Sequence, residues 1–228
     1  MPVIELERLS VMLLPIIFVG FFYYQWTKQR DEIAWATVRM SVQLLLIGYV
    51  LAFLFHNEMW FVGFAVVLFM IAVASKIVMR RTQEKTFTHY GLIFAAIFTA
   101  GTFHLALVLY GVIGLDPWYQ PKFIIPLGGM IYANAMNVLS LYIDRFESER
   151  LDHDYEKSRA VAFKSAMISQ INTFFAVGLV SLPGLMTGQI LSGVDPLIAV
   201  RYQIVVMAMI FGSAGGSIIF YSWVKKQN

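Results

Sequence analysis

Long runs of apolar residues, separated by short polar segments, extend along most of the chain. Crossing the hydrocarbon core of a bilayer takes about 20 mainly apolar residues in a helix. Seven segments meet this requirement: Ser10–Trp26, Ala36–Phe55, Met59–Val78, Gly91–Ile113, Phe123–Ile143, Ile171–Leu191 and Tyr202–Val224. The pattern predicts an all-α membrane protein, a bundle of about seven transmembrane helices in a single domain over residues 1–228.

Composition supports a membrane protein and excludes several other classes. Of 228 residues, 59% are hydrophobic and 14% are charged, whereas about 25% are charged in soluble domains. The chain has no cysteine, which excludes disulfide frameworks, zinc knuckles and iron–sulfur ligation. A formal net charge of +3, with basic residues scattered along the chain, does not indicate nucleic acid as a partner. The lipid bilayer is therefore the expected surrounding.

The basic residues are sorted between the two sides of the predicted membrane. Only Arg8, Lys122 and Arg201 lie on one side. The other side has 14 of the 17: Lys28, Arg30, Arg39, Lys76, Arg80, Arg81, Lys85, Arg145, Arg150, Lys157, Arg159, Lys164, Lys225 and Lys226. Because cytoplasmic loops are enriched in Lys and Arg, the N-terminus is expected outside the cell membrane and the C-terminus in the cytoplasm.

The longest polar segment is Asp144–Gln170, which contains helix formers and neither glycine nor proline. It is expected to be a cytoplasmic helix, supported by pairs three residues apart such as Glu147 with Arg150 and Glu156 with Arg159. Two interpretations remain open. The segment is either a solvated extension of the fifth span or a docking element for a cytoplasmic partner.

Catalytic motifs are missing from the sequence. It contains no G-x4-G-K-[ST], HExxH or GxSxG motif, so it is not expected to be an enzyme or to hydrolyse nucleotide through a phosphate-binding loop. The four histidines are dispersed, with His56 and His89 in predicted loops, His104 in the fourth span and His153 in the charged segment. His104 is expected to be a buried, hydrogen-bonded residue rather than a ligand.

Polar residues inside the spans are the candidate substrate path. Arg39 and Gln43 are four residues apart, Asn134 and Asn137 three apart, so each pair shares a helix face. A Pro-Gly pair interrupts the sixth span, and transporters use such interruptions to expose backbone groups. Interhelical hydrogen bonding and close packing are the alternative explanation for any single residue. The full set of candidates is Arg39, Gln43, Met130, Asn134, Asn137, Pro183, Gly184, Gln189 and, at the outer rim, Asp195.

Three stretches together resemble the FetB-type iron-export permease family, which also includes plant aluminium-tolerance permeases. The longest is VGLVSLPGLMTGQILSGVDP at 177–196, followed by AVRYQI at 199–204. The fifth span has IP at 125–126, GMI at 129–131 and NAM at 134–136, and the second has R at 39, QL at 43–44 and GYV at 48–50. The positions matched to the family pattern are Arg39, Gln43, Gly129, Asn134, Pro183, Gly184, Asp195 and Gln203.

The resemblance implies a membrane subunit of an ABC transporter that pairs with a separate ATP-binding subunit, forms a homodimer and exports a metal ion. It implies no cofactor bound by this chain, since ATP is used by the partner. The interval from Asn134 to Gly178 is shorter than in the family and lacks its LGA-type coupling motif, so Arg159, Lys164 and Gln170 are the candidates for a reduced coupling element. Two alternatives are an ATPase-independent carrier or channel of the same fold, and a membrane adaptor that binds a cytoplasmic partner. The sequence does not single out a set of metal ligands.

Overall fold

The computed structural model describes residues 5, 8, 10–29, 32–56, 60–117 and 119–227. These residues form helices joined by short connections, which confirms the predicted all-α class. The chain divides into two compact units, residues 1–57 and 58–228. The organisation of the whole chain as a single domain of seven transmembrane helices stays a prediction. Arg30 lies outside the described residues, and so do residues 57 and 58 of the short outer loop predicted over His56–Glu58.

The N-terminal unit contains α2 (Leu13–Thr27) and α3 (Glu32–His56), which match the first two predicted segments. Lys28 adopts a left-handed conformation with φ of 60° and ends α2, its backbone N–H donating to the Tyr24 carbonyl. The Tyr23 hydroxyl donates to the Glu32 carboxylate over 2.6 Å. This contact ties the end of α2 to the start of α3.

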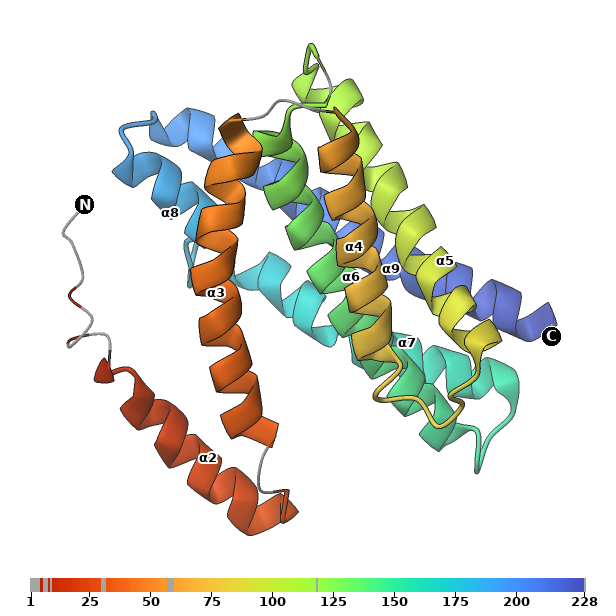
Figure 1. Ribbon diagram of the computed structural model, residues 1–228. Coiled ribbons are helices and arrows are strands. Elements are labelled where there is room, and N and C mark those ends of the chain that lie inside the picture. Colours follow the sequence, from red (N-terminus) through yellow and green to blue (C-terminus); the bar gives the residue numbers. More distant parts are fainter. Residues whose placement is uncertain are drawn as a thin grey trace. The chain divides into compact units, whose positions relative to one another are not determined.

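The C-terminal unit contains the remaining helices. The helices α4, α5 and α6 lie side by side, and α9 packs across α5 and α6 while α7 packs along α6 (Figure 1). Their bounds are α4 Trp60–Val78, α5 Phe87–Ala106, the π-helix η1 Leu107–Ile113, α6 Pro121–Glu149, α7 Tyr155–Ala176, α8 Gly184–Leu191 and α9 Pro196–Gln227.

Four helical stretches of the described residues are long and apolar enough to cross a membrane: Phe61–Val78, Phe87–Ile113, Pro121–Glu149 and Pro196–Lys226. They correspond to the third, fourth, fifth and seventh predicted segments. The helix α2, with 15 residues, is shorter than a full crossing requires. The sixth predicted segment, Ile171–Leu191, is interrupted at its Pro-Gly pair as predicted, and the interruption is longer than that pair, because α7 ends at Ala176 and α8 begins at Gly184.

A tight loop separates α7 from α8. Gly178 has a φ of +85°, a conformation that glycine adopts without the steric cost of a Cβ atom. Its N–H donates to the Ser181 carbonyl over 2.9 Å, and the Val180 N–H donates to the Ala176 carbonyl over 2.8 Å. Pro183 is extended and stands directly before α8, where its missing N–H removes no helical hydrogen bond. The interruption is thus built by a glycine and a proline at its two ends.

Glycines allow α5 to approach its neighbours closely. A Cβ atom on Gly212 of α9 would lie 2.2 Å from His104 Nε2, and one on Gly101 would lie 2.4 Å from Tyr132 Cε1. The His104 ring is held in place because Nδ1 donates to the Ala100 carbonyl over 2.8 Å. The expected hydrogen bond of His104 is confirmed, although its side chain is half-buried rather than fully buried.

Charged residues gather at one end of this unit, where the ends of α4, α6 and α9 meet the starts of α5 and α7. Lys225 pairs with Glu84, and Lys226 pairs with Glu156. Lys122 and Arg201 lie near the starts of α6 and α9, at the opposite ends of those helices. Within this unit the basic residues follow the predicted sorting, while the side of the membrane that each end faces stays a prediction.

The segment Asp144–Gln170 is two helices rather than one. The helix α6 ends at Glu149, and Asp154 caps α7 by accepting from the Lys157 N–H over 2.8 Å. The predicted pair of Glu156 with Arg159 is present. Glu147 does not support α6 by pairing with Arg150 but accepts hydrogen bonds from Thr82 and from the Gln83 N–H, both over 2.9 Å. It therefore links α6 to the loop before α5.

Candidate functional site

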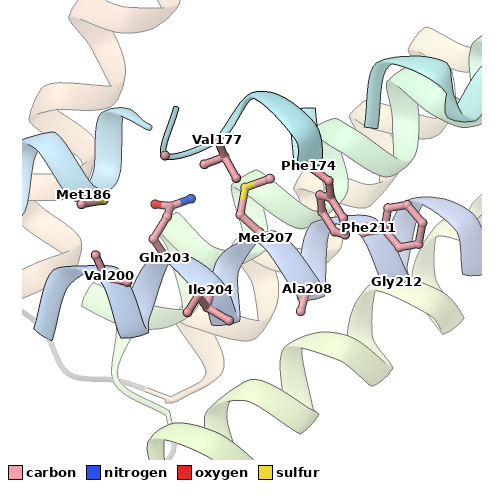
Figure 2. Close-up of a pocket in the computed structure, with 11 residues that line it drawn as sticks. Phe174, Val177, Met186, Val200, Gln203, Ile204, Met207, Ala208, Phe211 and Gly212 are labelled. Carbon is pink, nitrogen blue, oxygen red and sulfur yellow. The ribbon is translucent and has the colours of Figure 1, made fainter. Parts of the chain in front are cut away.

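A pocket of about 550 Å³ lies beside the interruption between α7 and α8. The end of α7, the loop after it, α8 and α9 all contribute to its wall (Figure 2). Most of its lining is apolar or aromatic: Phe174, Val177, Gly178, Met186, Val200, Gln203, Ile204, Met207, Ala208, Phe211 and Gly212. The rings of Phe174 and Phe211 lie 4.7 Å apart between centroids and join α7 to α9 at one wall.

Gln203 is the polar side chain of this pocket. It rises from α9 toward the interrupted segment, beside Met186 and below Val177 (Figure 2). Its side chain is 6% exposed, and its Oε1 atom is buried without a hydrogen-bond partner in the part of the chain that the structure describes. Leaving a buried acceptor unpaired costs about 1–3 kcal/mol. Such an atom therefore needs an explanation.

Gln189 on α8 has the same property, since its Oε1 atom is also buried and unpaired among the described residues. The predicted candidates Pro183 and Gly184 form the start of α8, and the Thr187 hydroxyl donates to the Pro183 carbonyl over 3.1 Å. The Pro183 carbonyl is therefore satisfied within α8. Among the described residues, the buried side-chain acceptors without a partner are the amides of Gln189 on α8 and Gln203 on α9.

Two other candidates meet between α6 and α7. The Gln170 amide donates to Asn134 Oδ1 over 3.2 Å, and the Asn134 amide donates to the Met130 carbonyl over 2.8 Å. Met130 is half-buried against the core. Asn137, predicted on the same face as Asn134, is exposed on α6. The structure thus joins a predicted path residue, Asn134, to a predicted coupling residue, Gln170.

The remaining candidates have separate surroundings. Asp195 caps α9, because its carboxylate accepts from the Leu197 N–H over 2.8 Å, which is a structural role for that side chain. Arg39 and Gln43 lie one turn apart on α3 in the N-terminal unit. On α7, Arg159 pairs with Glu156 and Lys164 is exposed.

His89, predicted in a loop, instead lies buried in the first turn of α5. Because Nδ1 faces the Glu84 carbonyl at 2.8 Å, the ring donates from that nitrogen. Nε2 then accepts from the Tyr221 hydroxyl over 2.8 Å and links α5 to α9. The sequence did not predict the contact between His89 and Tyr221. The start of α5 was predictable, because Thr86 is a helix-capping residue three positions before His89. Its hydroxyl accepts a hydrogen bond from the His89 N–H.

The described residues contain no group of three or more His, Cys, Asp or Glu side chains placed to hold a metal ion. The pocket lining offers an ion only neutral polar or polarisable groups, the Gln203 amide and the sulfurs of Met186 and Met207. Such donors interact more weakly with hard cations than carboxylates do.

Several apolar helices of membrane-crossing length, with a pocket beside an interrupted helix, define a multi-pass membrane protein. The chain belongs to the UPF0014 family, described as an uncharacterised protein family, whose model matches residues 6–156 and 150–228. The two matched stretches meet at the loop between α6 and α7. This loop lies within the interval from Asn134 to Gly178, which the family resemblance predicts to be shortened.

Named relatives support this assignment. The UPF0014 membrane protein YjkA of Bacillus subtilis is 32% identical over 85% of this chain and 82% of its own length. The probable iron export permease protein FetB of Escherichia coli is 30% identical over 83% and 78%. The protein ALUMINUM SENSITIVE 3 of Arabidopsis thaliana is 30% identical over 90% and 79%. The predicted family resemblance is therefore confirmed. No solved structure matches the chain.

Proposed function

We propose that this chain is the membrane permease subunit of an ABC-type exporter of iron or another metal ion, driven by ATP hydrolysis in a separate subunit. The relative in Escherichia coli carries the name of a probable iron export permease. The chain lacks a phosphate-binding loop, so the proposed motor is a second protein.

The single observation that carries the proposal is the interrupted helix beside the pocket. Val177 and Gly178 of the interruption and Met186 of α8 line the pocket together with α9. Transporters commonly form substrate sites at interrupted helices, because such helices change their arrangement when the protein switches between states. A movement of α8 relative to α9 would change the shape of this pocket directly.

The helix α7 is the proposed link to the ATP-binding subunit. Its first turns lie at the charged end, where Lys226 pairs with Glu156. Its middle is joined to α6 through Gln170 and Asn134, and its last turn contributes Phe174 to the pocket. One rigid helix thus reaches from an exposed charged surface, which includes Lys164, to the pocket wall.

In this proposal the charged end faces the cytoplasm of a cell membrane, with the N-terminus outside, and two copies form the permease. The positive-inside rule supports the orientation, since the basic residues collect at this end. The dimer follows from the family resemblance and awaits a mass measurement in detergent or lipid discs.

Co-purification followed by an ATPase assay tests the proposal. We expect an ATP-binding protein to be retained under gentle extraction, with an ATPase rate that depends on this chain and on the metal ion supplied. Lys164→Glu should reduce the stimulation about fivefold or more, because it reverses a charge on the proposed docking face. Lys122→Glu, the same change at the opposite end of the unit, is the control and should leave stimulation intact.

Two outcomes would contradict the proposal. The first is the absence of any retained ATP-binding protein. The second is metal flux through the purified chain in liposomes without ATP, which would favour the carrier or channel alternative.

A further inference from the structure

We propose that an anionic phospholipid binds along the face shared by α4 and α5, at the charged end of the C-terminal unit. Its headgroup contacts Lys76, Arg80 and Lys85, and one acyl chain lies along a row of aromatic side chains on α5. This inference goes beyond export of a metal ion. Lipid binding tests it whether or not the chain is coupled to an ATPase.

Basic side chains around the loop between α4 and α5 carry charge that the protein does not balance. Lys76 is in the last turn of α4, and Arg80 and Lys85 are in the loop. All three are exposed, and none forms an ion pair with a described residue. Glu84 is the one acidic residue between positions 76 and 87, and its carboxylate pairs with Lys225 of α9. This surface is therefore complementary to an anion.

The same loop is anchored on its inner side. The Thr82 hydroxyl and the Gln83 N–H both donate to the Glu147 carboxylate of α6 over 2.9 Å. His89 Nδ1 of α5 donates to the Glu84 carbonyl over 2.8 Å. The exposed cations thus extend from a backbone that is already ordered, which lowers the entropy lost when a headgroup binds.

Aromatic side chains continue from these cations along α5. The row consists of Phe87, Tyr90, Phe94 and Phe98, whose successive ring centroids lie 6.1–6.4 Å apart. Phe87 begins the row and is 88% exposed. The Tyr90 hydroxyl donates to the Ala72 carbonyl over 3.1 Å, which places this part of the row beside α4. Exposed aromatic rings next to lysines are typical of the headgroup level of a membrane.

The position of Lys76 and the length of the row fit one lipid molecule. Lys76 follows Ala72 by four residues and so lies on the side of α4 that meets Tyr90. Phe87 and Phe98 are 11 positions apart, a rise of about 16 Å in a helix, which is close to half of the roughly 30 Å hydrocarbon core. An acidic protein segment would neutralise the cations but leave the aromatic row uncovered, whereas a phospholipid covers both.

Titration of the purified full chain with phospholipid, followed by native mass spectrometry, tests the inference. The probe is dioleoyl phosphatidylglycerol, which is anionic. Dioleoyl phosphatidylcholine has the same acyl chains and no net charge. We expect the first phosphatidylglycerol molecule to bind about tenfold or more tightly than the first phosphatidylcholine molecule. Equal affinities would overturn the inference.

Charge removal at two places on the same end of the unit locates the site. The double variant Lys76→Gln, Lys85→Gln should raise the Kd of phosphatidylglycerol about tenfold or more. The control, Lys157→Gln with Lys164→Gln, removes the same charge from exposed positions on α7 and should leave the Kd unchanged. An equal loss of affinity in both double variants would mean that binding follows net charge, which would overturn the proposed site.

Photocrosslinking in lipid nanodiscs locates the acyl chain on the unaltered protein. Phosphatidylglycerol with a diazirine in one acyl chain should label the tryptic peptide 86–122, which contains α5, about threefold or more above phosphatidylcholine with the same diazirine. The peptide 165–201, which contains α8, should be labelled equally by both lipids. Equal labelling of 86–122 by the two lipids, or enrichment confined to 165–201, would overturn the inference. This measurement decides the question even where the double variant fails to fold.

Discussion

Asn134 of α6 and Gln170 of α7 are 36 positions apart in the chain and share a side-chain hydrogen bond of 3.2 Å. Gln170 is 7% exposed, so water does not compete freely for this bond. Asn134 belongs to the family pattern in the fifth predicted span, and Gln170 belongs to the segment proposed for coupling. The bond therefore connects the helix proposed to receive the ATPase movement to the core of the C-terminal unit.

A double-mutant cycle measures this connection. We predict a coupling free energy of about 0.5–1.5 kcal/mol between Asn134→Ala and Gln170→Ala in thermal or denaturant unfolding, which is the range for hydrogen bonds between membrane helices. If the two substitutions are simply additive within error, the bond does not contribute to stability. The pair Asn137→Ala and Gln170→Ala is the control and should be additive, because Asn137 is exposed on α6.

Gly212→Ala tests the close crossing of α5 and α9. The added Cβ atom would lie 2.2 Å from His104 Nε2, and the ring is held by its bond to Ala100. We predict that overpacking lowers the free energy of unfolding by about 1–3 kcal/mol. Tryptophan fluorescence during heating measures this loss. His104→Ala in the same chain should restore part of the loss.

Gly215→Ala is the matched control on the same helix. Its added Cβ atom would lie 3.7 Å from the flexible end of Met167, which is an ordinary contact. The substitution should be neutral or stabilising by up to about 1 kcal/mol, since alanine is the better helix former. Equal losses for Gly212→Ala and Gly215→Ala would show that the crossing is not close-packed through Gly212.

The ion pair of Glu84 and Lys225 gives a pH dependence. The hydrogen bond from the Lys225 ammonium holds the pKa of the Glu84 carboxyl below its ordinary value. The contribution of the pair is therefore fully present above the pKa of Glu84 in the unfolded chain, about 4.3, and is lost as pH falls through the lower pKa of the folded chain.

Glu84→Gln removes this contribution. Because both side chains are partly exposed, we expect a loss of at most about 1 kcal/mol at pH 7, or about 2–4 °C in melting temperature for a chain of this size. The difference between variant and wild type should close as pH falls toward 3. A difference that is constant with pH would mean that the loss does not come from the charge of Glu84.

Labelling of single cysteines tests the proposed orientation. The chain has no cysteine, so Lys85→Cys and Lys122→Cys each introduce one thiol, at opposite ends of the C-terminal unit. We predict that a membrane-impermeant maleimide added to intact cells labels Lys122→Cys, while Lys85→Cys reacts only after permeabilisation. The reverse pattern would place the charged end outside the cytoplasm.

Much of the fold follows from hydrophobic patterning. The spans containing α4, α5, α6 and α9 are predictable because each is a long apolar run whose ends coincide with charges. The break in the sixth span was predicted from its Pro-Gly pair, but its start directly after Ala176 was not, because the apolar residues continue through the interruption between Gly178 and Pro183. Hydropathy is insensitive to such a break, whereas the φ of Gly178 determines it.

The candidate site was predictable only in part. The family pattern includes Gln203, but a sequence cannot reveal that its oxygen is buried without a partner, because this depends on packing between α7, α8 and α9. The same limitation hid the bond between His89 and Tyr221, which are 132 positions apart. Asp195 was predicted as a substrate-path residue at the outer rim because local sequence does not separate a free carboxylate from one that caps a helix.

ATP-driven transport in proteoliposomes tests the proposed function most directly. The chain is reconstituted with its co-purified ATP-binding protein, and metal-ion accumulation is measured in vesicles whose cytoplasmic face points outward. We predict that accumulation requires ATP and both proteins. Lys164→Glu should reduce the accumulation, whereas Lys122→Glu should leave it unchanged. Accumulation that is unchanged when ATP or the ATP-binding protein is omitted would contradict the proposal that this chain is an ATP-driven export permease.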